Sequence, residues 1–273
     1  MRRPIRVVAL HALVLLGALL TLTPLLWMVS ASFMPAGSAN SYPPQLLPRA
    51  PTAGHYVELF TRLALYRHLL NSAVIAVATT LISLLVNSMA GYAFAKLRFP
   101  GRERVFRGLL AGLVIPAQVG MLPLFLMLKG LGLVNTMMGV IVPGMASIFG
   151  IFLIRQYALS IPDDLLDAAR IDGAGEFRIF RTIVLPIIRP ILVTLAVFSF
   201  LSSWNDFMWP LIVLSDDAKY TLPVALANLV GEHVQDTELM MAGSVLTVLP
   251  ALLVFLFLQR SYIRGVMMGS IKG

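Results

Sequence analysis

Residues 160–186 form a charged stretch between two long apolar runs. The stretch holds eight charged side chains: Asp163, Asp164, Asp167, Arg170, Asp172, Glu176, Arg178 and Arg181. The flanking runs look like membrane spans, so the stretch should be a short loop with a function on one side of a membrane. Residues 160–186 are therefore the first candidate functional segment.

Asp206 is an acidic residue well inside an apolar run, where it follows Asn205. A carboxylate in a membrane span is costly, and it often belongs to a substrate path or a gate. A structural role is also open, because Trp204 and Trp209 flank Asp206 as interfacial aromatic residues do. The carboxylate would then cap a broken helix near the outer interface. Asn205 and Asp206 are candidates for a translocation path or gate.

The chain lacks the motifs of common enzyme and nucleotide sites. It contains no GxxxxGK[ST], HExxH or GxSxG pattern. It has no cysteine, which excludes thiol catalysis and cysteine-ligated zinc, and its four histidines are scattered. We therefore expect no catalytic residue, metal or cofactor in this chain. Any energy for its work must come from another protein.

Composition indicates an integral membrane protein. The chain of 273 residues is 58% hydrophobic and 12% charged, too little polar surface to cover a soluble fold. Six apolar runs reach the length of a membrane-spanning helix. They cover residues 7–30, 69–95, 108–128, 137–154, 190–214 and 239–259. The predicted fold is all-α, with six transmembrane helices in a single domain over residues 1–273.

Positive charge predicts the orientation of these spans. With the N-terminus inside, 16 of the 21 Lys and Arg residues lie on the inner side, as the positive-inside rule requires. Both termini and residues 160–186 are then cytoplasmic. This asymmetry explains the net charge of +8 better than nucleic-acid binding does. The first run resembles a signal peptide, but its length favours a retained anchor.

Two further patterns predict helices outside the charged stretch. Residues 55–68 have apolar side chains at helical spacing opposite Glu58 and Arg62, which predicts an interfacial amphipathic helix or a docking surface for an external partner. The second span repeats small or polar residues at fourfold spacing, which favours close helix packing. These residues are Ser72, Ala76, Thr80, Ser83, Asn87 and Gly91.

The charged stretch itself predicts two short helices. Ser160 precedes Asp163 by three residues, which fits a capped helix start, and Gly173 fits its end. A second helix begins near Glu176. The apolar faces are predicted to be Leu165, Leu166, Ala168 and Ala169 in the first helix, and Phe177, Phe180 and Val184 in the second. Small residues beside charges suit a helix that inserts into a groove of another protein.

The same residues resemble a known family. Asp167-Ala168-Ala169, Gly173, Ile183 and Leu185-Pro186 resemble the EAA motif of the permease subunits of bacterial ATP-binding-cassette (ABC) importers. Asp167 stands where that family usually has glutamate. Further segments are similar to maltose-type carbohydrate permeases, and to the smaller permease subunits of that type above all. They are Asn71-Ser72, Trp204-Asn205-Asp206, Gln259-Arg260 and residues 92–101, 169–174, 220–223 and 269–273.

The resemblance, which covers residues 50–273, implies a coupling role for the cytoplasmic helices of residues 160–186, between spans 4 and 5. These helices would lodge in a cleft of an ATPase subunit. The implied coupling residues are Asp167, Ala168, Ala169, Asp172, Gly173, Ala174, Leu185 and Pro186. The resemblance also implies that Lys272 and Gly273, in the C-terminal tail, reach the ATPase.

The resemblance further implies the partners and the cargo. A second permease subunit would complete the translocation path in the bacterial cytoplasmic (inner) membrane, where this multi-pass chain also contacts lipid. Two ATPase subunits would hold ATP and magnesium. An extracytoplasmic binding protein would deliver a sugar, an oligosaccharide or a related polyol.

Two other function classes stay open on the sequence. The chain could be a self-sufficient channel or secondary carrier, although a carrier usually shows several intramembrane acids or an internal repeat. It could also be a membrane anchor or assembly subunit without a path of its own. The sequence does not identify the solute, and glycerol phosphate derivatives remain possible.

Overall fold

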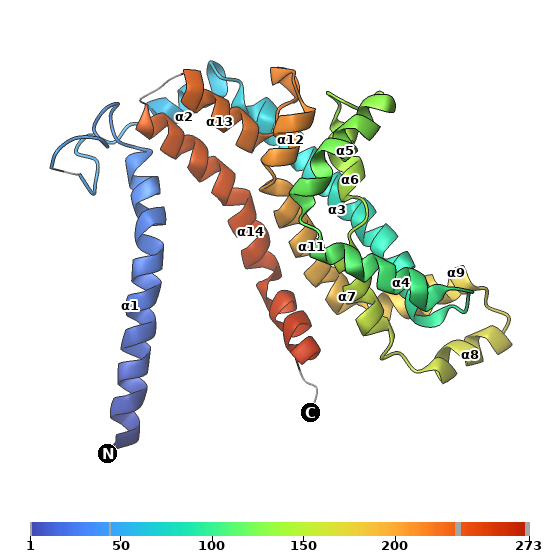
Figure 1. Cartoon of the computed structure of the whole chain (residues 1–273). Helices are drawn as coiled ribbons and strands as arrows, with labels where there is room; N and C mark the ends of the chain where they lie inside the picture. Colours follow the sequence, from blue (N-terminus) through green and yellow to red (C-terminus); the bar gives the residue numbers. More distant parts are fainter. Residues whose placement is uncertain (1, 44, 233–235, 271–273) are drawn as a thin grey trace. The chain divides into compact units, whose positions relative to one another are not determined.

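The computed structural model describes residues 2–43, 45–232 and 236–270, and all of their regular elements are helices (Figure 1). The all-α prediction is confirmed for this part of the chain. The chain forms two compact units. The first comprises Met1–Arg67 with Leu222–Pro250, and the second comprises His68–Thr221 with Ala251–Gly273.

Four described helices are long and apolar enough to cross a membrane. They are Leu10–Ala31, Leu65–Lys96, Met137–Ala158 and Thr237–Gln259. Two further pairs qualify only if each bent pair counts as one span. They are Arg102–Val114 with Ala117–Gly130, bent by 108°, and Glu176–Ile187 with Arg189–Trp204, bent by 81°. The described helices therefore supply four to six spans.

The third and fifth predicted spans, residues 108–128 and 190–214, are not continuous helices. The first of these breaks at Ile115, which has an extended backbone before Pro116, because proline disfavours helical geometry in the residue before it. The other ends at Trp204 and resumes at Met208. The sequence predicted each run as a span but not where its helix breaks, because length and hydropathy alone do not reveal a break.

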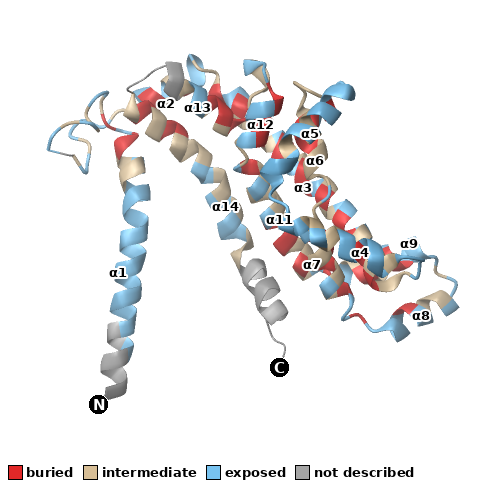
Figure 2. Ribbon diagram, viewed as in Figure 1, coloured by how far each residue is buried: buried red, intermediate tan, exposed pale blue. Residues whose placement is uncertain are grey.

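The first unit contains α1 (Arg2–Ala31), α2 (Gly54–Thr61), α13 (Leu222–Glu232) and the first part of α14 (Thr237–Ser270). Most of α1 is exposed along its length (Figure 2). Its leucines, such as Leu13 at 67% exposure, need lipid or a partner to cover them. The predicted helix over residues 55–68 is shorter than expected, because α2 ends at Thr61.

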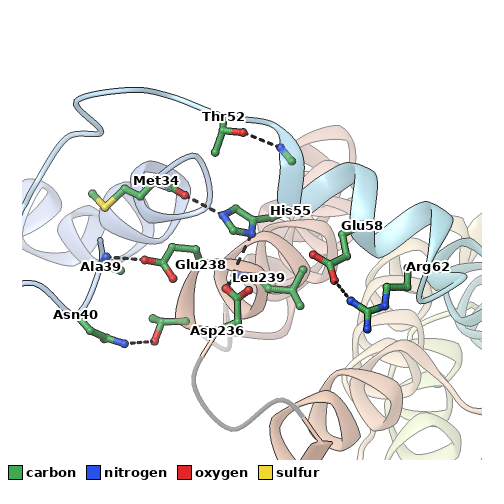
Figure 3. Close-up of polar contacts among 12 residues, drawn as sticks. Met34, Ala39, Asn40, Thr52, His55, Glu58, Arg62, Asp236, Glu238 and Leu239 are labelled. Atoms are coloured by element: carbon green, nitrogen blue, oxygen red, sulfur yellow. Dashed lines mark hydrogen bonds and ion pairs between the residues drawn. The ribbon is translucent and has the colours of Figure 1, made fainter. Parts of the chain in front are cut away.

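Polar contacts tie the segment after α1 to α2 and to the start of α14 (Figure 3). The backbone N–H of Ala39 donates to Oε1 of Glu238 at 2.6 Å, and the Glu238 side chain is fully buried. Nε2 of His55 lies 2.8 Å from the carbonyl oxygen of Met34. Because Ala39 and Glu238 lie 199 residues apart in sequence, this contact joins the two separate chain segments of the first unit.

Replacing Glu238 with alanine is expected to destabilise this unit. The Ala39 N–H would lose its side-chain acceptor inside the protein, and a buried donor left without a partner costs about 1–3 kcal/mol. Thermal unfolding of the purified chain in detergent measures the effect as a lower Tm. The matched control is Glu58→Ala, which removes an ion pair with Arg62 on the surface and should cost less than about 0.5 kcal/mol. Equal shifts in both variants would contradict the assignment.

The second unit contains the remaining helices. They are most of α3 (Leu65–Lys96), α4 (Arg102–Ala111), α5 (Ala117–Gly130), α6 (Met137–Gly144), α7 (Ile148–Ala158), α8 (Asp163–Ile171), α9 (Glu176–Ile179), α10 (Leu185–Ile187), α11 (Arg189–Trp204), α12 (Met208–Val213) and the part of α14 from Ala251 onward. A π-helical turn, Phe180–Val184, joins α9 to α10. Within this unit, α8 and α9 lie at one end and α5 and α12 at the other (Figure 1).

Close packing of α3 against α7 supports the end that carries α8. A Cβ atom added to Gly91 would lie 2.6 Å from Ile154, so only glycine allows this approach. Asn87 accepts a hydrogen bond from the backbone N–H of Ser147 at 3.0 Å, just before α7. For Asn87 and Gly91, the close packing predicted from fourfold spacing is confirmed.

Candidate functional site

The first helix of the charged stretch, α8, begins at Asp163 without a side-chain cap. Pro162 occupies the cap position, and the hydroxyl of Ser160 donates instead to the carbonyl oxygen of Tyr157. The predicted cap by Ser160 was therefore wrong. Asp163 and Asp164 lie in the first turn, where negative charge favours the helix dipole.

The elbow after α8 is a Schellman turn at Gly173. Gly173 has φ +79°, and its N–H donates to the carbonyl oxygen of Arg170. The N–H of Ala174 donates to Ala169, which closes the outer ring of the motif. Asp172, the C-cap residue, donates its N–H to Ala168. The predicted glycine elbow is confirmed, and a left-handed residue is required at position 173.

The two faces of α8 differ from the predicted ones. Leu166 is buried and Ala169 packs on the same cluster, three residues further on. Leu165 and Ala168 are exposed, and Ile171 is 86% exposed. Grouping the four apolar residues on one face was wrong, because Leu165 and Ala168 lie one position off the Leu166–Ala169 row. The helix therefore presents a second, outward apolar face.

The second helix also faces differently from the prediction. Phe180 and Val184 are buried as expected, but Phe177 is 66% exposed and Ile179 takes the inner position. Phe177 precedes the π-helical turn at Phe180–Val184, and Ile179 packs in the buried cluster in its place. Beyond it, Leu185 packs partly on the cluster that holds Leu166, whereas Pro186 is exposed.

Hydrogen-bonded charges connect α8 to α9 across the elbow. Arg170 donates from Nε to Glu176 at 2.7 Å and from a terminal nitrogen to Asp167 at 2.6 Å. The other oxygen of Glu176 accepts from the hydroxyl of Tyr92, on α3, at 2.7 Å. Asp167 thus pairs within its own helix and does not reach the rest of the unit directly.

A second contact anchors the start of α8 to the end of α3. The ammonium group of Lys96 donates to the carbonyl oxygen of Ile161 at 2.6 Å and to Asp163 at 2.7 Å. The hydrogen bond from Lys96, then its charge, lowers the pKa of Asp163. The carboxylate therefore stays ionised below the usual pH range of an aspartate, and the ion pair persists at neutral pH.

We define Lys96, Tyr92, Asp163, Asp167, Arg170 and Glu176 as the elbow network.

The elbow network includes residues that the sequence did not point to. Tyr92 and Lys96 were not predicted as site residues, although they lie four residues apart at the end of α3. That spacing puts both on one helical face and was the available signal. Arg170 and Glu176 were recognised as charged, but their pairing depends on the turn at Gly173.

Asp206 lies in the connection between α11 and α12, and α12 lies at the opposite end of this unit from α8 (Figure 1). One of its oxygens accepts a hydrogen bond from the backbone N–H of Trp209 at 3.3 Å, at the start of α12. Asp206 also lines a hollow of about 700 Å³, whereas Asn205 does not and donates to Leu201 in its own helix. The capping role is present, and it leaves Asp206 at the wall of the hollow.

The hollow is lined mainly by hydroxyl, aromatic and apolar side chains. The hydroxyl groups come from Thr79, Ser83, Ser147, Ser199, Ser202 and Ser203, and the aromatic rings from Phe149, Phe198 and Trp209. Its described lining has no lysine or arginine. No group of His, Cys, Asp and Glu that could hold a metal ion occurs among the described residues.

Lys272 and Gly273, predicted to contact the ATPase, lie outside the described residues.

Residues 87–267 match the family described as the binding-protein-dependent transport system inner membrane component. The chain belongs to this family. It is the membrane permease of an ABC importer rather than the ATPase, and it resides in the inner membrane with several membrane spans.

Curated relatives of this permease cover almost the whole chain. The arabinooligosaccharide transport permease AraQ of Halalkalibacterium halodurans is 40% identical over 94% of this chain and 93% of its own length. The diacetylchitobiose uptake permease NgcG of Streptomyces coelicolor is 33% identical over 96% of this chain and 88% of its own length.

A solved structure has a similar fold. It is a chain of a bacterial ABC transporter involved in the import of the acidic polysaccharide alginate. The TM-score is 0.83 at 25% identity, over 94% of this chain and 97% of the other.

Proposed function

We propose that α8 and the Gly173 elbow couple this permease to an ATPase subunit. The observation that carries the proposal is the outward apolar face of α8. Charged residues on the other sides of the helix hold it in position. Leu165, Ala168 and Ile171 are exposed, while Lys96 and Arg170 fix the two ends of the helix. An exposed apolar face rimmed by charge suits insertion into a groove of a partner.

The proposed complex contains a second permease, two ATPase subunits and an extracytoplasmic binding protein. ATP and magnesium would be held by the ATPase subunits, in keeping with the absence of a nucleotide motif from this sequence. Closure of the ATPases would move α8 as a rigid body and open the path outward. Lys272 and Gly273 would add a second contact to the ATPase.

We further propose six spans within a single permease domain, with both termini cytoplasmic. The two bent helix pairs would each count as one span, and 16 of the 21 Lys and Arg residues support this orientation. This topology puts α8 and its partners on the ATPase side. Asp206 and the hollow then lie toward the outer side.

The proposed cargo is a carbohydrate: a sugar, an oligosaccharide or a related polyol. Hydroxyl groups and aromatic rings line the hollow, and they suit a polyhydroxylated solute that needs hydrogen bonds and an apolar surface together. The relatives that transport arabinooligosaccharides and diacetylchitobiose support this class. The second permease would complete the wall of the path.

Reconstitution tests this function. The chain is purified with its second permease and ATPase and placed in liposomes with the binding protein and an arabinooligosaccharide. We expect ATP hydrolysis to rise with the loaded binding protein, and sugar uptake to require ATP. Sugar uptake by the chain alone, without ATP or partners, would favour the channel or carrier class instead.

Replacing Asp206 with alanine is expected to reduce sugar uptake about tenfold or more, because a hydrogen-bonding carboxyl group at the wall of the path is lost. Asp206→Asn keeps an oxygen for the Trp209 N–H and should be affected less. Asn205→Ala is the matched control, since that side chain does not line the hollow. If Asp206→Ala transports normally, the carboxylate serves only as a helix cap.

A further inference from the structure

The helix α4 carries a polar face that the coupling role does not use. The segment Arg102–Val114 is bent by 108° from Ala117–Gly130, so both cannot run along the membrane normal. If α5 crosses the bilayer, the polar start of α4, with Arg104 and Arg107, lies at the inner membrane surface as in interfacial amphipathic helices, and only the apolar end of the segment belongs to the span. Phe106 faces the interior at 4% exposure, while Arg104 and Arg107 are exposed.

These two arginines and Arg98 line a cleft of about 1460 Å³ between α8 and the connection from α3 to α4. None of the three makes a hydrogen bond or an ion pair among the described contacts, and Arg98 acts on Asp163 only as a charge. The acids of the cleft are already paired. Asp163 pairs with Lys96, Asp167 and Glu176 pair with Arg170, and Glu103 pairs with Arg102 and Arg155. The cleft therefore has uncompensated positive charge.

Exposed apolar side chains lie beside this charge. Phe99 is 39% exposed on the connection, Val105 is 52% exposed on α4, and Val114 at the end of the segment is 84% exposed. A ligand that satisfies both kinds of surface has an anionic head and an apolar tail. A soluble anion would leave the apolar residues uncovered.

We propose that Arg98, Arg104 and Arg107 bind the headgroup of an acidic phospholipid of the cytoplasmic leaflet. Basic residues immediately cytoplasmic of a membrane span attract anionic lipid, and Arg98 lies two residues beyond the end of α3. The phosphate would contact the arginines, and the acyl chains would cover Val105 and its neighbours. The site rests on the cytoplasmic orientation proposed above, but binding in detergent requires no transport.

A bound lipid would also steady the coupling region. Glu103 of α4 accepts a hydrogen bond from Arg155 of α7 at 2.9 Å, and the Arg155 guanidinium lies 4.1 Å from the centre of the Phe106 ring. At the other side of the cleft, Lys96 anchors α8. Lipid bound to α4 thus lies next to both elements that position the elbow network.

Lipid titration of the purified full chain tests the site. Native mass spectrometry in detergent measures the binding of dioctanoyl phosphatidylglycerol and of dioctanoyl phosphatidylcholine. We expect phosphatidylglycerol to bind more tightly than phosphatidylcholine. Removing each arginine should weaken the binding of phosphatidylglycerol about fivefold. The triple variant Arg98→Gln/Arg104→Gln/Arg107→Gln should lose this preference, and Arg104→Gln alone provides the smaller loss if the triple variant does not fold.

The matched control removes three other exposed arginines from the same predicted side. Arg178, Arg181 and Arg189 do not line the cleft, so Arg178→Gln/Arg181→Gln/Arg189→Gln should keep the wild-type preference. Equal losses in both triple variants would reduce the effect to general surface charge and overturn the site. Equal wild-type affinity for the two lipids would also overturn it. Displacement of phosphatidylglycerol by an equal concentration of glycerol 3-phosphate would overturn the lipid assignment, because the acyl chains would then add nothing to binding.

Discussion

Gly173→Val is expected to reduce ATP-driven uptake strongly while leaving the chain in the membrane. Gly173 has φ +79°, and a side chain in that left-handed conformation costs about 1–2 kcal/mol, more for a β-branched one. The Schellman turn would open, and α8 would lose its fixed direction relative to α9. Uptake into liposomes should fall tenfold or more, since about 1.4 kcal/mol corresponds to a factor of ten.

Gly175 supplies the matched control for this change. It lies two residues further on, but with φ −72° and ψ 158°, which any residue adopts. A Cβ atom added to either glycine meets no atom within 4 Å, so only the backbone conformation separates them. Gly175→Val should transport nearly normally, and Gly173→Asn should retain more activity than Gly173→Val, because asparagine tolerates this conformation. Equal defects at both positions would contradict a conformational role for Gly173.

Arg170→Met is expected to be the second most damaging change in the coupling region. Arg170 joins Asp167 of α8 to Glu176 of α9, and methionine keeps much of its length without the charge. Because Arg170 is 35% and Asp167 62% exposed, solvent weakens each ion pair to about 1 kcal/mol or less. Losing both contacts should lower coupled uptake about tenfold at most, while ATP hydrolysis by the partner continues.

A double-mutant cycle separates this network from general charge loss. If Arg170 acts through Glu176, the double variant Arg170→Met/Glu176→Gln should show a smaller loss of coupled uptake than the sum of the losses in the two single variants. Arg178→Met is the control on the neighbouring helix, where the arginine is exposed and should contribute little. Strictly additive losses would mean that the Arg170–Glu176 contact does not carry the effect.

The sequence predicted the features that depend on local chemistry or on overall composition. A composition that is 58% hydrophobic indicates a membrane protein. The missing GxxxxGK[ST] pattern indicates that the chain does not bind a nucleotide by itself. Gly173 marks the elbow because few residues other than glycine adopt its backbone conformation. The spacing from Asp167 to Pro186 indicated the permease family before any fold was known, because that motif keeps its residues at fixed intervals.

Only the tertiary structure decided which side chains meet across the chain. Tyr92 and Lys96 meet the charged stretch 84 and 67 residues further on, and no local pattern encodes such a contact. The outward face of α8 also depended on tertiary packing, because helical spacing fixes which residues share a row but not which row is buried. The sequence singled out Asp206 because a carboxylate in an apolar run is energetically costly. Its hydrogen bond to the α12 backbone and its position at the wall of the hollow became clear only from the fold.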